Sequence, residues 1–321
     1  MQSQDSITST TAPTENQLFV LARSGKLIFP KFIPASTRPF IERWVYPLAA
    51  LVFAFFVPIL SSLLGLPLMI LGRGLPGIPG DGQGLFLFLV AGFLPIFVLI
   101  WVWLYVFEGR SLGSTGLQRP FWVKYLRGLL VGVLMIAVVM GMLAAFGYMS
   151  LETAVTVPML TTALLPALLL FLGWMVQGAA EELLARGFLF PIFGIRFGVL
   201  VGIFVSSILF AFLHLNNPGV GPIAYLNLAL FGVFTCLYAL FEGGLWGVCA
   251  IHAIWNWAQG NLFGIEVSGV VVSGGVLMNF NETGPDWLTG GTFGPEGGLA
   301  VSMILILSIL FVWVIYNRTA A

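Results

Sequence analysis

The side chains that could do chemistry lie in three separate apolar segments of this chain. They are Glu181, Glu182 and Arg186 in GAAEELLARGFLFP, Phe210 and His214 in FAFLHLNN, and His252 and Asn256 in HAIWNW. The sequence contains no other histidine. Because ionisable groups are costly inside a membrane, such a set indicates a functional site.

The spacing of these residues places pairs of side chains on shared helix faces. Residues four apart project from the same side of a helix, which applies to Glu182 with Arg186 and to His252 with Asn256. The first pair could be a purely structural ion pair, and a histidine or asparagine can simply join two membrane helices by a hydrogen bond. Glu181 has no basic neighbour one turn away in its own helix, which favours a functional role for it.

The elements that must position these residues are membrane-spanning helices. Of the 321 residues, 59% are hydrophobic and 8% are charged, whereas a soluble domain carries roughly 25% charged residues. We expect an all-α, polytopic transmembrane helical bundle of about eight spans. The expected spans are 45–70, 84–107, 126–148, 160–195, 197–215, 222–241, 245–263 and 299–316. Pro191 predicts a kink or a break near the end of the long fourth span.

The placement of charges predicts the domain organisation and the sidedness of the chain. We expect residues 1–44 to form a polar disordered tail and a cytoplasmic membrane-surface segment, and residues 45–318 to form the helical membrane domain. Basic residues concentrate before the first span and in the 108–125 loop, whereas the 264–298 loop has four acidic residues and no basic one. By the positive-inside rule, both termini are expected in the cytoplasm. The expected location is a bacterial plasma membrane, in multi-pass form.

This topology brings the candidate residues to similar depths in the membrane. At 1.5 Å of rise per residue, Glu181 lies ~22 Å and His214 ~24 Å along their helices from the cytoplasmic side. His252 and Asn256 lie at ~10–17 Å. We therefore expect side chains from the three segments to meet.

Taken together, the three segments resemble a known family. E-E-x-x-x-R at 181–186, F-x-x-x-H at 210–214 and H-x-x-x-N at 252–256 look like the three motifs of the CPBP family. That family groups CAAX prenyl endopeptidases with bacteriocin-processing and self-immunity proteins, and its members are intramembrane glutamic endopeptidases. The resemblance covers about residues 160–263, roughly a third of the chain, and implies a CPBP-like catalytic core there.

The resemblance also implies a role for each residue and a cavity that opens towards the cytoplasm. Glu181 and His214 would activate water, and His252 and Asn256 would stabilise the oxyanion. Physical chemistry agrees, because hydrolysis needs a base for water and preorganised donors for the tetrahedral intermediate. The supporting residues would be Glu182, Arg186 and Phe210.

Two other interpretations stay open. Glu181, His214 and His252 could instead hold zinc with one open position, as in a zinc-dependent membrane protease. A non-catalytic scaffold, an immunity-type protein or a transporter could also use buried charges. The H-E-x-x-H motif is absent, and every aspartate lies outside the predicted spans, which argues against that type of zinc protease and excludes an aspartyl dyad.

The expected partners are the lipid bilayer and a membrane-associated peptide or protein substrate. The formal net charge is zero and no nucleic-acid-binding motif is present, so we expect no nucleic acid to bind. Apart from the zinc alternative, no cofactor is expected. Cys236 and Cys249 lie in apolar stretches, which favours packing over a disulfide.

Overall fold

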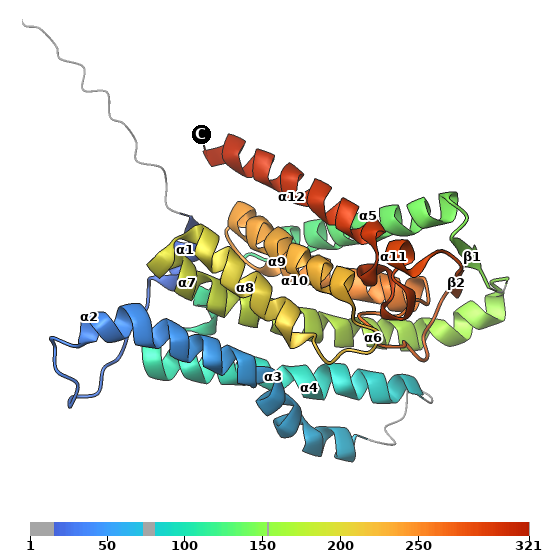
Figure 1. The fold of residues 1–321 in the computed structure, drawn as a ribbon. Coiled ribbons are helices and arrows are strands. Elements are labelled where there is room, and N and C mark those ends of the chain that lie inside the picture. The colour runs from blue at the N-terminus through green and yellow to red at the C-terminus, as the bar shows by residue number, and fades with distance from the viewer. Residues whose placement is uncertain (1–15, 73–80, 153, 321) are drawn as a thin grey trace, which may run out of the picture.

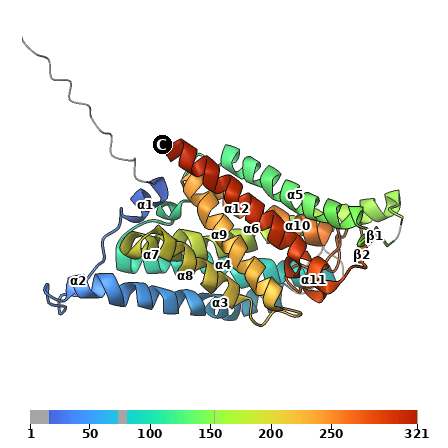
Figure 2. The ribbon, with the colours of Figure 1, turned by 45° about the horizontal axis from the view of Figure 1, so that its top comes forward.

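Long apolar helices lie side by side in the computed structural model, which describes residues 16–72, 81–152 and 154–320 (Figure 1). The long helices are α3 (Tyr46–Leu71), α4 (Asp81–Trp103), α5 (Trp122–Ala145), α6 (Val157–Glu182), α9 (Pro222–Glu242) and α12 (Leu299–Ala320). The shorter ones are α1 (Gln17–Ala22), α2 (Arg38–Phe40), α7 (Phe190–Phe197), α8 (Val199–Leu213), α10 (Trp246–Trp257) and α11 (Asp286–Thr289). The strands β1 (Met149–Leu151) and β2 (Phe280–Glu282) form one antiparallel pair. Figures 1 and 2 show α3 at one edge of the bundle and α5 with α12 at the opposite edge.

The all-α membrane bundle is confirmed, but the prediction of about eight spans is not. Six helices among the described residues are long and apolar enough to cross a membrane: Arg38–Leu71, Gly82–Glu108, Trp122–Ala145, Val157–Phe197, Pro222–Glu242 and Leu299–Arg318. The other two predicted spans also form helices, α8 and α10, but these have 15 and 12 residues. At 1.5 Å per residue, α8 is about 22 Å long, which is shorter than the roughly 30 Å apolar layer of a bilayer.

The fourth predicted span is a single helical segment with a π-helical insertion. The α-helical pattern of α6 ends at Glu182, a π-helix covers Leu183–Leu189, and α7 resumes the α-helix. Pro191 lies two residues after the last residue of the π-helix and has no amide hydrogen to donate to the preceding turn. The predicted interruption therefore occurs just before Pro191, in the turn that contains Arg186.

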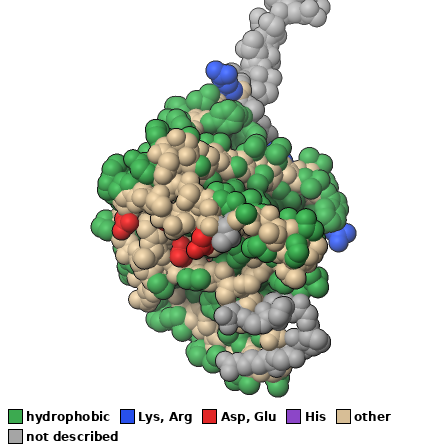
Figure 3. Space-filling model, turned by 90° about the vertical axis from the view of Figure 1, so that its right-hand side faces the viewer, with side chains coloured by type: hydrophobic (Ala, Val, Ile, Leu, Met, Phe, Trp, Pro, Cys, Tyr) green, Lys and Arg blue, Asp and Glu red, His purple; other side chains and the backbone are tan. Residues whose placement is uncertain are grey.

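The two ends of the bundle differ in charge. One end holds α1, α2 and the C-terminal residues, and it carries the basic residues of segments 23–43 and 110–127 with Arg196 and Arg318. The other end holds β1, β2 and α11, and its described residues between 263 and 298 include four acidic residues and no basic one. Figure 3 views this second end, where acidic side chains lie on the face and basic ones only at the rim. We call them the basic end and the acidic end; the basic end is the one predicted to be cytoplasmic.

The N-terminal segment is partly inserted into the bundle. Leu18 and Phe19 are buried, and the Phe19 ring packs against Phe190 of α7 with 5.4 Å between ring centroids. Asn16 accepts a hydrogen bond from the Leu18 amide and donates one to the Leu240 carbonyl oxygen at 2.7 Å. This part of the segment is thus anchored in the bundle and does not lie wholly along a surface. Of the predicted tail, 1–15 lies outside the described residues.

The segment expected to be an outer loop, 264–298, is folded against the acidic end. Its strand β2 pairs with β1, with Met149 opposite Glu282. Phe293 is fully buried, and Val267 pairs with Val270 in an isolated bridge. The acidic residues of this segment therefore sit on a structured part of the protein.

The helix α10 lies between α5 and α6 because small residues line both contacts. A Cβ atom added at Gly178 of α6 would lie 3.3 Å from the Cβ atom of His252, and one added at Gly128 of α5 would lie 2.3 Å from the Gly247 carbonyl oxygen. Close helix approach through small residues is typical of membrane bundles. The contact with α6 brings His252 next to the two glutamates.

Candidate active site

Glu181, His214, His252 and Asn256 line one cavity within the bundle. Glu181 lies near the end of α6, His214 directly follows α8, and His252 and Asn256 lie on α10. The three segments that the sequence singled out are therefore brought together. Further polar residues that line the cavity are Gln177, Asn217, Asn227, Ser268 and Glu296, and the apolar side chains of the wall include residues of α3, α4, α8, α9 and α12.

A buried charge network holds His252 in place. The Nδ1 atom of His252 lies 3.0 Å from the Oε1 atom of Glu182, and the Nη1 atom of Arg186 lies 3.2 Å from the same oxygen. Glu182 and Arg186 have no exposed side-chain surface. The predicted pairing four residues apart is present, and the same carboxylate also binds the histidine.

Arg186 is stabilised by charge and by an aromatic ring. Its Cζ atom lies 4.4 Å from the centroid of the Phe210 ring, a distance at which a guanidinium is attracted to a ring face. None of its nitrogens has a hydrogen bond with proper geometry to a described residue, so the Glu182 contact is an ion pair by distance alone. Phe210 therefore supports the site through Arg186, and it also packs edge-on against His252 at 6.0 Å.

Glu181 differs from Glu182 in its surroundings. Its Oε2 atom lies 3.8 Å from the Nε2 atom of His252, which is too long for a hydrogen bond, and this oxygen has no hydrogen-bond partner among the described residues. Its side chain is 15% exposed and lines the cavity, whereas Glu182 is fully buried and does not. Of the two carboxylates, Glu181 is the one available to a bound molecule.

The orientation of His214 is fixed by the main chain. Its Nδ1 atom lies 2.8 Å from the carbonyl oxygen of Phe210. Because a carbonyl oxygen can only accept, Nδ1 must carry the proton. In the neutral ring Nε2 then keeps its lone pair, so it can accept a proton or a hydrogen bond from water.

Gln177 is a site residue that the sequence analysis missed. The Nδ2 atom of Asn256 donates to the Oε1 atom of Gln177 at 3.0 Å, and both residues are buried and line the cavity. This leaves the second N–H of the Asn256 amide for another acceptor. Gln177 lies four residues before Glu181, so the same helix spacing that joins Glu182 to Arg186 could have identified it.

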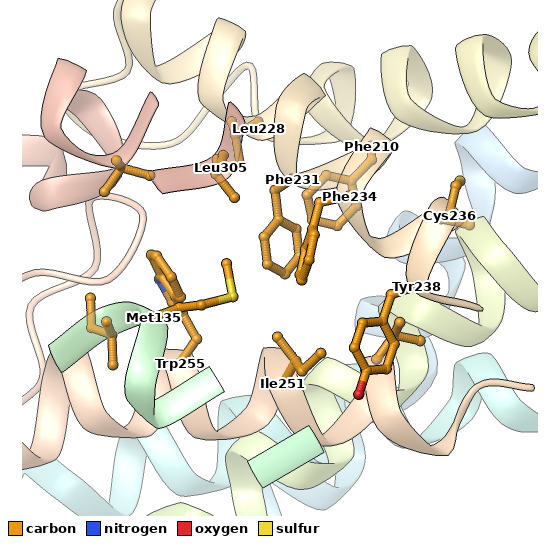
Figure 4. Packing of buried hydrophobic residues seen from close by; sticks show 14 of the residues in the cluster. Met135, Phe210, Leu228, Phe231, Phe234, Cys236, Tyr238, Ile251, Trp255 and Leu305 are labelled. Carbon is orange, nitrogen blue, oxygen red and sulfur yellow. The ribbon is translucent and has the colours of Figure 1, made fainter. Parts of the chain in front are cut away.

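Aromatic side chains cover the other side of His252. The Phe231 ring of α9 meets the imidazole edge-on at 5.2 Å and packs near Phe210, with 5.9 Å between centroids. Figure 4 shows Phe210, Phe231 and Phe234 side by side in the core. This apolar packing excludes water from that side of the imidazole and strengthens its electrostatic contacts with the carboxylates.

The candidate zinc ligands do not form a ligand cluster. Among the described residues, no three His, Cys, Asp or Glu side chains lie close enough together to hold a metal ion. One nitrogen of His252 faces Glu182, which is not part of the suggested set of Glu181, His214 and His252.

The cavity lies closer to the acidic end than the resemblance implied. Its wall includes Val267, Ser268, Val270 and Glu296 of the folded outer segment, and no residue of its lining comes from the basic end. The expectation of a cavity open towards the cytoplasm came from the family resemblance, and the helix depths agreed with it. It overlooked that residues between 264 and 298 fold back against the bundle.

Comparison with known proteins supports a protease site in this region. The family model described as type II CAAX prenyl endopeptidase, Rce1-like, matches residues 163–258, a range that contains all seven residues singled out by the sequence. No curated protein matches the chain. Together with the apolar helices, the match makes this an integral, multi-pass membrane protein of the CAAX protease type. Over residues 163–258 the chain therefore resembles the Rce1-like type II CAAX prenyl endopeptidases, which confirms the resemblance that the three motifs indicated.

Proposed function

We propose that this protein is an intramembrane endopeptidase that uses a glutamate-activated water to hydrolyse a peptide bond in a membrane-associated peptide or protein. The observation that carries the proposal is the convergence of Glu181, His214, His252 and Asn256 on one cavity. The family match supports a peptidase in general. The assignment of residues to steps, the substrate and a bacterial plasma membrane location are part of the proposal.

Glu181 is the proposed base. Its Oε2 atom is unpartnered and borders the cavity, so the carboxylate can accept a proton from water as the water oxygen attacks the carbonyl carbon. His214 presents Nε2 with a lone pair, which can orient that water. When the C–N bond breaks, the proton taken up by Glu181 passes to the leaving amine.

Asn256 and His252 are the proposed oxyanion donors. Asn256 has one N–H that Gln177 does not use. His252 donates to Glu182 from Nδ1, so it can donate from Nε2 only as an imidazolium. In that form the cluster is balanced, because the charges of Glu181 and Glu182 are matched by those of Arg186 and His252. The 3.8 Å separation leaves Nε2 uncommitted to Glu181 and able to donate to an oxyanion.

Peptidomics of membrane fractions tests this proposal. Cells that produce the wild-type protein are compared with cells that produce Glu181→Ala or the control Asp286→Asn, an exposed acidic residue outside the cavity. We expect a set of cleaved membrane peptides that disappears with Glu181→Ala and persists with Asp286→Asn. Identical peptide sets in all three strains would contradict the proposal and favour a scaffold or a transporter.

A further inference from the structure

The cavity contains a second polar cluster that the proposed catalysis does not use. The Oε2 atom of Glu296 accepts hydrogen bonds from the backbone nitrogen of Ser268 at 2.7 Å and from its Oγ atom at 2.6 Å. The Oε1 atom of Glu296 accepts one from Nε1 of Trp255 at 3.1 Å. Glu296 and Ser268 both line the cavity, and Trp255 lies on the helix of His252 and Asn256. We call Glu296, Ser268 and Trp255 the clasp.

The backbone around the clasp is also tied to the helix α9 and to the turn that follows α8. Asn227 of α9 donates through Nδ2 to the carbonyl oxygen of Glu296 at 2.8 Å. Asn217 donates through Nδ2 to the carbonyl oxygen of Ser268 at 2.9 Å, and its own amide donates to the carbonyl oxygen of His214. The clasp and these contacts therefore connect both halves of the 264–298 segment to α9, to the turn that contains His214, and to α10, which carries His252 and Asn256.

The conformation of Ser268 shows that this part of the wall is held in place. Its φ angle is 49°, in the left-handed region that residues other than glycine rarely adopt. Such conformations persist where surrounding contacts enforce them. Ser268 lies between Val267 and Val270, which pair with each other and line the cavity. The positions of these two valines thus depend on the contacts of Ser268 with Glu296.

We propose that Glu296 is a positioning residue that holds residues 267–270 as the acidic-end wall of the cavity, and that this wall limits the size of the substrate group that can enter. The part of the inference that concerns substrate rests on the proposed function. The clasp itself can be tested independently of catalysis, by measuring how accessible the side chains of residues 267–270 are to a reagent.

Glu296→Gln tests the hydrogen bonds of the clasp with little change in side-chain shape. The amide has nearly the shape of the carboxylate, but one of its two ends is a donor. One orientation sets an NH2 group against the Ser268 amide, and the other sets it against the Trp255 N–H. Either way one donor meets another donor, and the charge that strengthens these bonds is lost.

The experiment measures labelling of Val267→Cys in the full chain, reconstituted in liposomes. Val267 is 3% exposed, and Cys236 and Cys249 are fully buried, so the introduced thiol is the reporter. A small methanethiosulfonate and a bulky fluorescein maleimide are applied separately. The matched control is Asp286→Asn in the same segment, and Glu296→Gln without the reporter cysteine detects any general unfolding through Cys236 and Cys249.

We expect Glu296→Gln to raise the rate of bulky labelling at least about tenfold, the factor expected from losing one charge-assisted hydrogen bond, with a smaller effect on the small reagent. Asp286→Asn should change neither rate. An unchanged rate with Glu296→Gln would overturn the inference, and so would equal acceleration at the native cysteines. If this variant does not fold, Ser268→Ala replaces it, and the absence of any increase with Ser268→Ala overturns the inference.

Loss of the clasp and failure of the proposed function give different results. Faster labelling in a protein that cleaves no peptide would support the clasp and contradict the peptidase proposal. In an active protein, Glu296→Gln should change KM and extend cleavage to bulkier peptides while kcat for the original peptide stays within about tenfold, since the catalytic side chains keep their contacts.

Discussion

The Nδ1 atom of His252 donates to the Oε1 atom of Glu182, and the Nη1 atom of Arg186 lies 3.2 Å from the same oxygen. One buried carboxylate therefore orients a histidine of the cavity and neutralises an arginine. The spacing of Glu182 and Arg186 predicted only the second of these contacts. His252 would lose its orientation if Glu182 were changed.

Glu182→Gln should lower both stability and activity. The change leaves Arg186 buried without a counter-charge, which typically costs about 3–5 kcal/mol of unfolding free energy. It also replaces the acceptor of His252 by an amide, so turnover should fall. Thermal unfolding of the purified protein in detergent, alongside peptide cleavage, measures both effects. An unchanged unfolding temperature would mean that the network around Arg186 is not needed for folding.

Asn256→Ala should lower turnover by about 10²–10³, the usual loss for one oxyanion donor. Gln177→Ala should have a smaller effect in the same direction, because Gln177 acts by fixing the Asn256 amide. In the Asn256→Ala background, Gln177→Ala should have no further effect on kcat, since coupled residues are not additive.

The matched control for these double variants of Gln177 and Asn256 is Trp257→Phe. It removes another hydrogen bond between α6 and α10, the one from Trp257 to the Ala167 carbonyl oxygen. Trp257 does not line the cavity. The effect of Trp257→Phe on kcat should be the same in the wild-type and the Asn256→Ala backgrounds. Additive losses for Gln177→Ala and Asn256→Ala would show that Gln177 does not act through Asn256.

Exhaustive chelation should leave activity unchanged, and the purified protein should contain no stoichiometric zinc. This expectation follows from the distribution of contacts: His252 binds Glu182 through Nδ1, and Glu181, His214 and His252 do not gather as three ligands among the described residues. Elemental analysis and cleavage assays before and after chelation are the measurements. Zinc that restores an activity abolished by its removal would establish the metal mechanism instead.

Cysteines placed at Ser111 and at Pro285 should react from opposite sides of the membrane. Both positions are exposed, one at the basic end and the other at the acidic end. The concentration of basic residues predicts that Ser111 faces the cytoplasm. An impermeant maleimide added to intact cells should label Pro285→Cys only. Labelling of both from one side would require an even number of crossings between them and would contradict this topology.

The sequence predicted the parts of the fold that follow from composition and helix spacing. Six of the eight predicted apolar segments form helices long enough to span, and the pairing of Glu182 with Arg186 follows from helix geometry. The count of about eight is not confirmed, because α8 and α10 are too short to be identified as spans by length. Window hydropathy does not distinguish a short buried helix from a full span.

The missing parts of the site depend on contacts between distant segments. Gln177 meets Asn256 and Glu296 meets Ser268 across 79 and 28 residues of sequence. The segment that contains Glu296 is rich in glycine and mixes polar with apolar residues, so no periodic pattern predicted that it would fold against the cavity. Buried polar partners of this kind are specified by tertiary packing.

The cleavage rate of Glu181→Gln tests the central claim most directly. Wild type, Glu181→Gln and Asp286→Asn are reconstituted in liposomes with a peptide identified from the membrane fractions, and cleavage is measured at equal amounts of folded protein. Because Glu181 borders the cavity and its Oε2 has no hydrogen-bond partner among the described residues, Glu181→Gln should leave the unfolding temperature unchanged. It should lower cleavage by at least about 10²–10⁴, the contribution of a general base. Cleavage by Glu181→Gln at the wild-type rate would contradict the account.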